Sequence, residues 1–189
     1  MIALARLFDE DEAGVAKALF LAPNAEILKK NEATLKLFCE RFGKKMVRLR
    51  GSIPADADLR RIAGAQLVLA TAEHWDYVSR RWKANKKGAP IRAVNLVILE
   101  HVHMINHGSS AYEVCCARLR LMFASLKNQH RIIALATSVA NSRDLADWLG
   151  ISVDNTFNFR PRERPIHLDL QVNTFDQHEP TSRFYSMTR

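Results

Sequence analysis

The chain has 189 residues, 48% of them hydrophobic and 25% charged, with a formal net charge of +8. This length suits one domain with a sizeable core and argues against a second full domain. The composition is that of a folded chain rather than a disordered one. No apolar run approaches the ~20 residues that span a membrane, and no secretory signal is recognisable. The positive charge favours a polyanionic partner, with nucleic acid as the first candidate.

Short apolar runs predict five strands, over residues 17–22, 45–50, 66–71, 95–100 and 131–137. The run at 95–100 is apolar on both faces, as a central parallel strand must be. Helical patterns lie between the strands. They predict a helix from an N-cap at Thr71, one with a Ser110–Glu113 capping box, and one from an N-cap at Asn141 to a stop at Gly150. This alternation predicts an α/β fold with a doubly wound, mostly parallel sheet.

The pattern changes after residue 150. Alternating apolar residues predict a half-buried strand that leaves the domain, and a linker follows it; the alternating residues are Ile166, Leu168, Leu170 and Val172. We therefore expect one domain over residues 1–165 and an exit strand with linker over 166–189. The three cysteines form neither a disulfide framework nor a Cys-x-x-Cys pair, so we expect buried thiols in a reducing compartment; they are Cys39, Cys115 and Cys116.

Three histidines follow the 95–100 strand in the stretch "LEHVHMINH", at His101, His103 and His107. Imidazoles bind zinc readily, but no cysteine or second histidine pair lies nearby in sequence. Three interpretations remain open: a metal site, a degenerate phosphate-chemistry motif, or ordinary loop histidines. We favour the degenerate motif and predict no metal.

Several long motifs resemble one known family in order and spacing. They are "LAPNAEIL", "LVLATAEHWDYVSRRWK", "LVILEHVHMI", "RIIALATSVANSRDLADWLG" and "TFNFRPRERP". Together they resemble the first RecA-like domain of DExH-box (Ski-two-like) RNA helicases, most nearly the C-terminal cassette of the two-cassette spliceosomal type. The resemblance implies a RecA-like, P-loop NTPase-type fold that lacks its P-loop segment, which would precede Met1. It also implies a second RecA-like domain beyond residue 189.

The resemblance further implies ATP and magnesium chemistry, but this sequence departs from it. The family's Asp-Glu-x-His corresponds to Glu100, His101, Val102 and His103, so that His101 stands where the catalytic Glu would be. Motif three corresponds to Ala136, Thr137 and Ser138. A largely neutral imidazole replaces a carboxylate poorly. We therefore predict no catalytic residue and no cofactor-binding residue in this chain, and no nucleotide hydrolysis.

RNA contact is a further implication of the resemblance. In related helicases the loops at the strand ends hold phosphates of the loading strand. These loops correspond to Pro23, Asn24, Gly51, Ser52 and Thr71. A basic run could add nonspecific attraction, or could be a solvated helix end; it contains Arg80, Arg81, Lys83, Lys86 and Lys87. We expect weak, nonspecific RNA binding.

The leading hypothesis is a catalytically inactive domain that serves as a regulatory or protein-docking scaffold in nuclear pre-mRNA splicing. Its expected partners are splicing proteins and the rest of the helicase, with no membrane. Arg160, Arg162 and Arg164, spaced by prolines and a glutamate, are candidate contacts for acidic partners. Two alternatives remain: a truncated fragment of an active RNA-dependent ATPase, and a stand-alone basic RNA-binding module.

Overall fold

A computed structural model describes residues 1–11, 14–51, 55–106, 110–126, 130–137, 139–163, 165–166, 168–169, 171–172, 174 and 178–187. The chain divides into two compact units, Met1–Asn158 and Phe159–Arg189, and each is described by itself. None of the helices in the described ranges is both long enough and apolar enough to cross a membrane.

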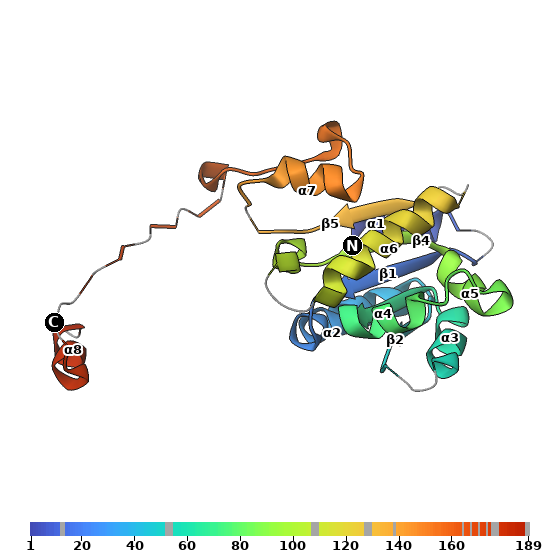
Figure 1. Ribbon diagram of the computed structural model, residues 1–189, viewed down its shortest axis with the longest axis horizontal. Coiled ribbons are helices and arrows are strands. Elements are labelled where there is room, and N and C mark those ends of the chain that lie inside the picture. Colours follow the sequence, from blue (N-terminus) through green and yellow to red (C-terminus); the bar gives the residue numbers. More distant parts are fainter. Residues whose placement is uncertain are drawn as a thin grey trace. The chain divides into compact units, whose positions relative to one another are not determined.

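The first unit is built on a five-stranded parallel sheet with the strand order β2-β3-β1-β4-β5 (Figure 1). The strands are β1 (Lys17–Ala22), β2 (Met46–Arg48), β3 (Leu67–Thr71), β4 (Val94–Leu99) and β5 (Arg131–Ala134). Parallel neighbours require crossover connections, and helices supply them. These are α2 (Ala25–Arg41), α3 (Asp56–Ala63), α4 (Ala72–Ser79), α5 (Asn85–Arg92) and α6 (Ser110–Ser125), with α1 (Ile2–Asp9) before β1 and α7 (Ser142–Leu149) after β5. The predicted α/β class and parallel sheet are confirmed.

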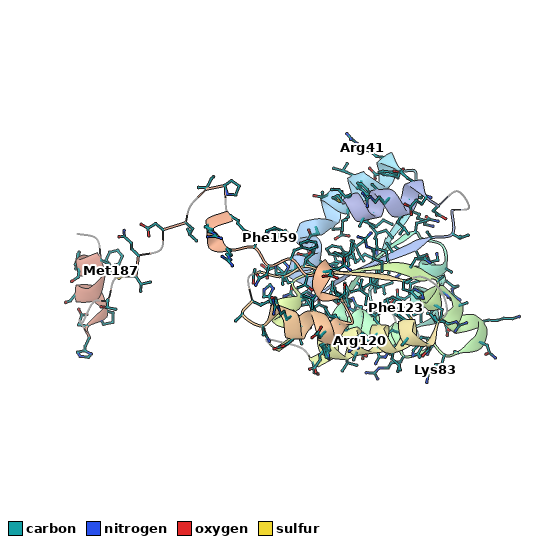
Figure 2. All side chains as sticks on the ribbon, turned by 90° about the horizontal axis from the view of Figure 1, so that it is seen from above. Arg41, Lys83, Arg120, Phe123, Phe159 and Met187 are labelled. Carbon is teal, nitrogen blue, oxygen red and sulfur yellow. The ribbon has the colours of Figure 1, made fainter. Side chains whose placement is uncertain are left out.

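The helices cover both faces of the sheet, as the doubly wound prediction requires. Figure 2 shows α1 and α2 on one side of the sheet, where Arg41 is labelled, and α6 on the other, where Arg120 and Phe123 are labelled. Residues of β1 alternate between the two cores: Phe20 packs with Phe8 of α1, and Leu19 packs with Trp75 of α4. Strands buried on both faces explain why the 95–100 run is apolar throughout.

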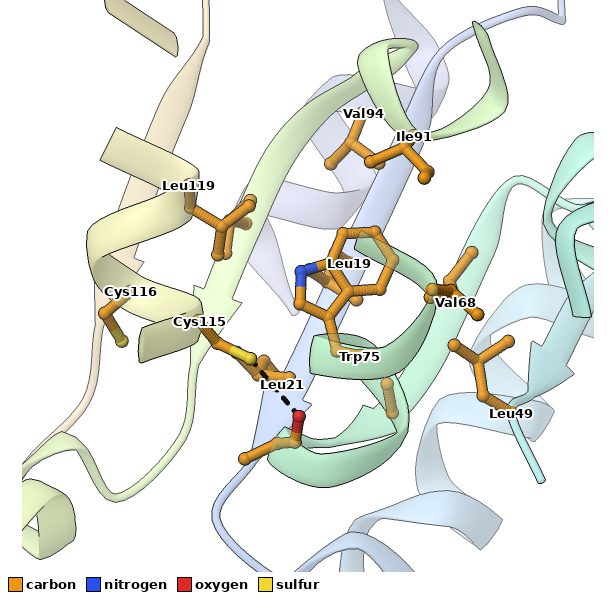
Figure 3. Packing of buried hydrophobic residues seen from close by; sticks show 14 of the residues in the cluster. Leu19, Leu21, Leu49, Val68, Trp75, Ile91, Val94, Cys115, Cys116 and Leu119 are labelled. Atoms are coloured by element: carbon orange, nitrogen blue, oxygen red, sulfur yellow. Dashed lines mark hydrogen bonds between the residues drawn. The ribbon is translucent and has the colours of Figure 1, made fainter. Parts of the chain in front are cut away.

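Trp75 is the largest fully buried side chain and lies at the centre of the α4 and α6 side (Figure 3). It is surrounded there by aliphatic residues such as Leu19, Val68 and Leu119. The thiol of Cys115 donates a hydrogen bond to the Ala72 carbonyl oxygen over 3.2 Å and joins α6 to α4. All three cysteines are buried and free, as predicted. Burial raises the pKa of Cys39 to about 11 and that of Cys116 to about 12, so neither thiol ionises readily.

Burial falls away at the β5 side of the sheet. Every residue of β1 and β3 is buried, whereas Arg131 of β5 is exposed and Ile132, Ile133 and Ala134 are half-buried. Strand β5 pairs with β4 and with no other strand of the described chain. It therefore has the composition of a central strand in the position of an edge strand.

Helix boundaries follow the predicted signals closely. Helix α4 begins after Thr71, whose hydroxyl accepts a hydrogen bond from the His74 amide, and α6 begins at Ser110. Helix α7 ends at Gly150, whose φ of 74° is the left-handed conformation that glycine tolerates. Asn141 precedes α7 as predicted, but its side chain makes no capping hydrogen bond, so that part of the prediction was wrong.

The second unit contains the short 3-10 turn η3 (Pro161–Glu163) and the helix α8 (Pro180–Met187). The first unit has two such turns, η1 (Val102–Asn106) and η2 (Val153–Asn155). Where an exit strand was predicted, Ile166, Leu168 and Val172 are 83%, 69% and 79% exposed. None of the described residues of this unit lies in a strand.

Candidate functional site

The carboxyl ends of the parallel strands meet at one edge of the sheet, and most of the predicted site residues that the structure describes lie along this carboxyl edge. Asn24 follows β1 and its side-chain oxygen accepts a hydrogen bond of 3.0 Å from the Ile27 amide. Thr71 ends β3 and caps α4 in the same way, over 3.4 Å. Both side chains thus have a structural role as N-caps, and the helix amino termini they cap carry partial positive charge. Pro23 lies between β1 and Asn24 and is half-buried.

Glu100 and His101 follow β4, and hydrogen bonds to the Glu100 backbone fix this segment. The Glu100 amide donates to the Leu21 carbonyl oxygen over 2.9 Å, and the Tyr112 hydroxyl donates to the Glu100 carbonyl oxygen over 2.7 Å. Burial raises the pKa of Tyr112, so its hydroxyl stays protonated. His101 has a φ of 54°, the only positive φ among the described non-glycine residues. Such a conformation costs energy and persists only where neighbours fix it.

The side chains of Glu100 and His101 face each other. His101 Nδ1 lies 2.8 Å from Glu100 Oε1, and the Glu100 side chain is only 15% exposed. The carboxylate that would hold a metal ion in the family motif is therefore engaged by the neighbouring imidazole. Among the residues that the structure describes, no three His, Cys, Asp or Glu side chains are grouped so that they could hold a metal ion.

His103 connects the two degenerate motifs. Its ring centroid lies 5.4 Å from that of His101, and its Nδ1 accepts a hydrogen bond of 3.2 Å from the Thr137 amide. The Val102 amide donates to the Leu135 carbonyl oxygen over 2.9 Å. The structure thus brings together the residues predicted as motifs two and three, and Val102 is buried while Ala136 is exposed. Ser138 and His107 lie outside the described residues.

Gly51 and His74 add a contact that the sequence did not reveal. Gly51 has a φ of 68°, and a Cβ atom there would lie 2.7 Å from His74 Cδ2. The loop after β2 therefore packs directly on the first turn of α4, next to Thr71. His74 Nδ1 is buried without a hydrogen-bond partner. The sequence hinted at the contact between Gly51 and His74 only by placing a histidine three residues after the N-cap predicted at Thr71. Ser52 lies outside the described residues.

Arg80 and Arg81 lie at the other end of α4 from Thr71. Eight helical residues at 1.5 Å each separate them by roughly 12 Å. Arg80 pairs with Asp76 Oδ2 over 2.5 Å, and Arg81 pairs with Asp56 Oδ1 over 3.3 Å. The structure therefore groups Asn24, Gly51 and Thr71 along one edge but places the two arginines elsewhere, where both are engaged in ion pairs.

Asp76 anchors this second region. Arg118 of α6 pairs with its Oδ1 over 2.7 Å, and Arg118 also donates to the Ser79 hydroxyl over 2.7 Å. Burial alone would raise the pKa of Asp76, but hydrogen bonds and charge from Arg80 and Arg118 outweigh it and lower the pKa below its usual value. The network therefore joins α4 to α6.

Comparison with known proteins gives consistent results. The DEAD/DEAH box helicase family matches residues 1–146. The U5 small nuclear ribonucleoprotein 200 kDa helicase of Caenorhabditis elegans is 38% identical over 176 residues, and the human protein is 35% identical over 153. These matches cover 92% and 80% of this chain. Activating signal cointegrator 1 complex subunit 3 of Rattus norvegicus is 32% identical over 190 residues, the full chain.

The matches cover only 8%, 7% and 8% of these three relatives, so the chain corresponds to a small part of much larger proteins. Among solved structures, the DUF1998 helicase MrfA bound to DNA and AMPPNP matches with a TM-score of 0.56. It is 15% identical, over 75% of this chain and 20% of that protein, and it supports the RecA-like fold alone. On the family match and these relatives, the chain belongs to the DEAD/DEAH box helicase family.

Proposed function

We propose that this chain is a RecA-like domain of a splicing-related helicase that does not hydrolyse ATP and that acts as a regulatory or protein-docking scaffold. The observation that carries the proposal is the pairing of His101 with Glu100 at the place where the family has a magnesium-binding Asp and a catalytic Glu. The similarity to two U5 small nuclear ribonucleoprotein helicases supports the link to splicing.

The residues present do not fit a magnesium nucleotide. Magnesium prefers oxygen ligands in octahedral geometry, and in this position it usually bridges carboxylate and phosphate oxygens. Here the Glu100 carboxylate is in contact with His101, and imidazole nitrogens of His101 and His103 flank the strand end. The 189 residues also contain no Gly-Lys-Ser or Gly-Lys-Thr sequence that could cradle phosphates. No nucleotide chemistry is therefore assigned to this chain.

Phosphate release tests the loss of activity. The wild-type chain and the double variant Glu100→Asp/His101→Glu are incubated with magnesium, ATP and single-stranded RNA, and fluorescent-nucleotide binding is measured in parallel. We expect no RNA-stimulated release and no saturable nucleotide binding from either protein. RNA-stimulated release by the wild type would overturn the proposal, and release by the double variant alone would show that only the two motif residues were missing.

Exposed aromatic and cationic groups near residue 160 support a docking role. Phe157, near the end of the first unit, is 75% exposed. Further along the chain, the Arg160 amide donates to Glu163 Oε2 over 3.1 Å, which orders the Pro161–Glu163 turn that carries the exposed Arg162. Guanidinium groups on an ordered turn can form bidentate pairs with carboxylates of a partner.

A nuclease-treated nuclear extract provides the second test. The bait proteins are the wild type, Arg160→Glu/Arg162→Glu, and the charge-matched control Lys29→Glu/Lys30→Glu on the exposed surface of α2. We expect the wild type and the control to retain spliceosomal proteins identified by mass spectrometry, and the first variant to lose them. Recovery of no splicing protein by the folded wild type, or equal recovery by all three, would contradict docking at this turn.

A further inference from the structure

Residues 55–92 are one of the parts of the first unit with an excess of positive charge. They contain eight Lys and Arg residues against four Asp and Glu residues, a net charge of +4. These residues span α3, β3, α4 and α5. Because helices α3 and α4 run back from the carboxyl edge, the last turn of α3, with Arg60 and Arg61, and the basic residues that follow α4 lie towards the opposite, amino edge of the sheet.

Three of the four acidic residues of this region are in described ion pairs. Asp56 contacts Arg81, Asp58 contacts Arg61 over 3.0 Å, and Asp76 contacts Arg80 and Arg118. Glu73 lies in the first turn of α4, towards the carboxyl edge. The exposed cations Arg60, Lys83 and Lys86 therefore carry charge that no neighbouring carboxylate of this region neutralises in the ion pairs described.

These cations come from neighbouring elements. Lys45 Nζ lies 4.0 Å from the position that a Cβ atom of Gly64 would take, so it borders the carboxyl terminus of α3, where Arg60 is found. On the other side α3 packs against α5, and Figure 1 shows the two helices next to each other. Figure 2 shows Lys83, in the turn between α4 and α5, at the rim of the unit. We call Lys45, Arg60, Lys83 and Lys86 the amino-edge cations.

The surface lacks the apolar groups of a protein interface. Protein-docking sites have buried anchors, most often aromatic, at their centre. Within the described residues 55–106, no large hydrophobic side chain is exposed, and Trp82 is 9% exposed beneath Lys83, whose Nζ lies 5.2 Å from the indole centroid. A phosphate backbone needs only accessible cations at a suitable spacing, because contacts to phosphates carry affinity without sequence information.

We propose that the amino-edge cations form a binding surface for the phosphate backbone of RNA, separate from the strand ends at the carboxyl edge. This inference goes beyond the scaffold function and does not depend on it. The surface attracts RNA without regard to sequence, and its affinity falls steeply with salt because bound counterions are released. It gives the domain an RNA contact at the edge opposite Asn24, Gly51 and Thr71.

Fluorescence anisotropy of a labelled uridine 15-mer, titrated with the full chain between 50 and 200 mM NaCl, tests the proposal. The first variant carries Lys45→Gln, Arg60→Gln, Lys83→Gln and Lys86→Gln. The control loses the same four charges from exposed positions dispersed over α1, α2, α6 and α7: Arg6→Gln, Lys36→Gln, Arg120→Gln and Arg143→Gln. All eight side chains are exposed, and thermal unfolding checks that both variants fold.

We expect the first variant to bind at least ~10-fold more weakly at 50 mM NaCl and its log–log salt slope to shrink by about 3, at ~0.7 for each single-strand phosphate contact. The control should change affinity by less than ~3-fold. Equal losses in the two variants would show that net charge alone matters and would overturn the site. Absence of RNA binding by the wild type at 50 mM NaCl, or tighter binding of polyglutamate than of the uridine 15-mer, would also overturn it.

Discussion

The two ends of the parallel strands are held in different ways. At the amino edge, Lys17 and Arg92 each donate to three backbone carbonyl oxygens, so these cations are committed to the framework. At the carboxyl edge, His101 and His103 each make one described side-chain hydrogen bond or ion pair, and Ala136 and Thr137 are exposed. The contrast shows which side chains hold the framework: substitutions of Lys17 and Arg92 should affect folding, and substitutions of side chains at the carboxyl edge should mainly affect binding.

Breaking the Asp76 network should have the largest effect. Asp76→Asn removes the negative charge that faces Arg118, whose side chain is only 18% exposed, and leaves that guanidinium without its ion pair. Removing one partner of a largely buried ion pair costs about 3 kcal/mol. Urea unfolding at pH 7, followed by circular dichroism, measures the loss. An effect below ~1 kcal/mol would show that the network is not a structural anchor.

At low pH the wild type and the Asp76→Asn variant should no longer differ in their free energy of unfolding. The pKa of Asp76 is lower in the folded chain than its usual value of 3.8, so its contribution to stability is fully present above that value. It is lost as the pH falls through the lower, folded-state pKa. Urea unfolding of both proteins from pH 7 down to pH 3 should therefore show their stabilities converging below about pH 4. A constant difference across this range would contradict the lowered pKa.

Lys17→Met should have the next largest effect. Lys17 Nζ donates to the carbonyl oxygens of Ile62, Ala63 and Ala65 over 3.0, 2.9 and 2.6 Å, and the side chain is 8% exposed. The variant leaves these carbonyl groups at the end of α3 without their donor, which we expect to cost about 2 kcal/mol. The nearby, exposed Lys45→Met should change the free energy of unfolding by less than ~0.5 kcal/mol. Equal effects would refute the special role of Lys17.

Gly88→Ala should destabilise a helix in which alanine is normally the better residue. A Cβ atom at position 88 would clash with the Trp82 carbonyl oxygen and lie 2.7 Å from the Arg81 carbonyl oxygen. Overpacking against backbone costs about 1–3 kcal/mol. The matched control is Gly64→Ala, where the nearest atom would lie 3.8 Å away and no loss is expected. Thermal unfolding that ranks the two variants equally would contradict the close packing.

At the carboxyl edge, His101→Gly should not destabilise the chain and should raise the free energy of unfolding by up to ~1 kcal/mol. Glycine adopts a φ of 54° without strain, and the substitution removes only the described contacts of the His101 ring with Glu100 and with the His103 ring. His103→Gly, at a position without positive φ, should instead lower stability by about 1 kcal/mol. If His101→Gly lowers stability as much as His103→Gly does, the two edges of the sheet do not differ as described.

The sequence predicted the fold well because the buried strands contain little besides apolar residues, and because Thr71 and Gly150 mark helix ends by local chemistry. It predicted the 45–50 and 131–137 strands too long, since continuing apolar character does not show where a neighbouring strand stops. They end at Arg48 and Ala134. The contact of Gly51 with His74 could not be predicted from sequence, because residues 23 positions apart meet only through the β2–β3 pairing.

Arg80 and Arg81 illustrate a second limit. Their charge and position at a helix end are visible in the sequence, and the Arg80–Asp76 pair has the i,i+4 spacing of a single helix. The pairing of Arg81 with Asp56 joins residues 25 positions apart and could not be predicted. By contrast, the neighbourhood of Glu100, His101 and Thr137 followed from motif order, because the ends of adjacent parallel strands must meet. Local chemistry and strand adjacency were predictable, whereas the long-range ion pair of Arg81 was not.

Strand β5 also affects how the isolated chain behaves in concentrated solution. Its outer row of amide and carbonyl groups faces no described strand. Apart from the exposed Arg131 at its start, β5 has no proline or charged residue that would oppose pairing with another strand. Two such edges can align whenever two molecules collide, so the rate of pairing rises with the square of protein concentration. Storage at low concentration, or a lysine in place of Ile132, should therefore keep the chain dispersed.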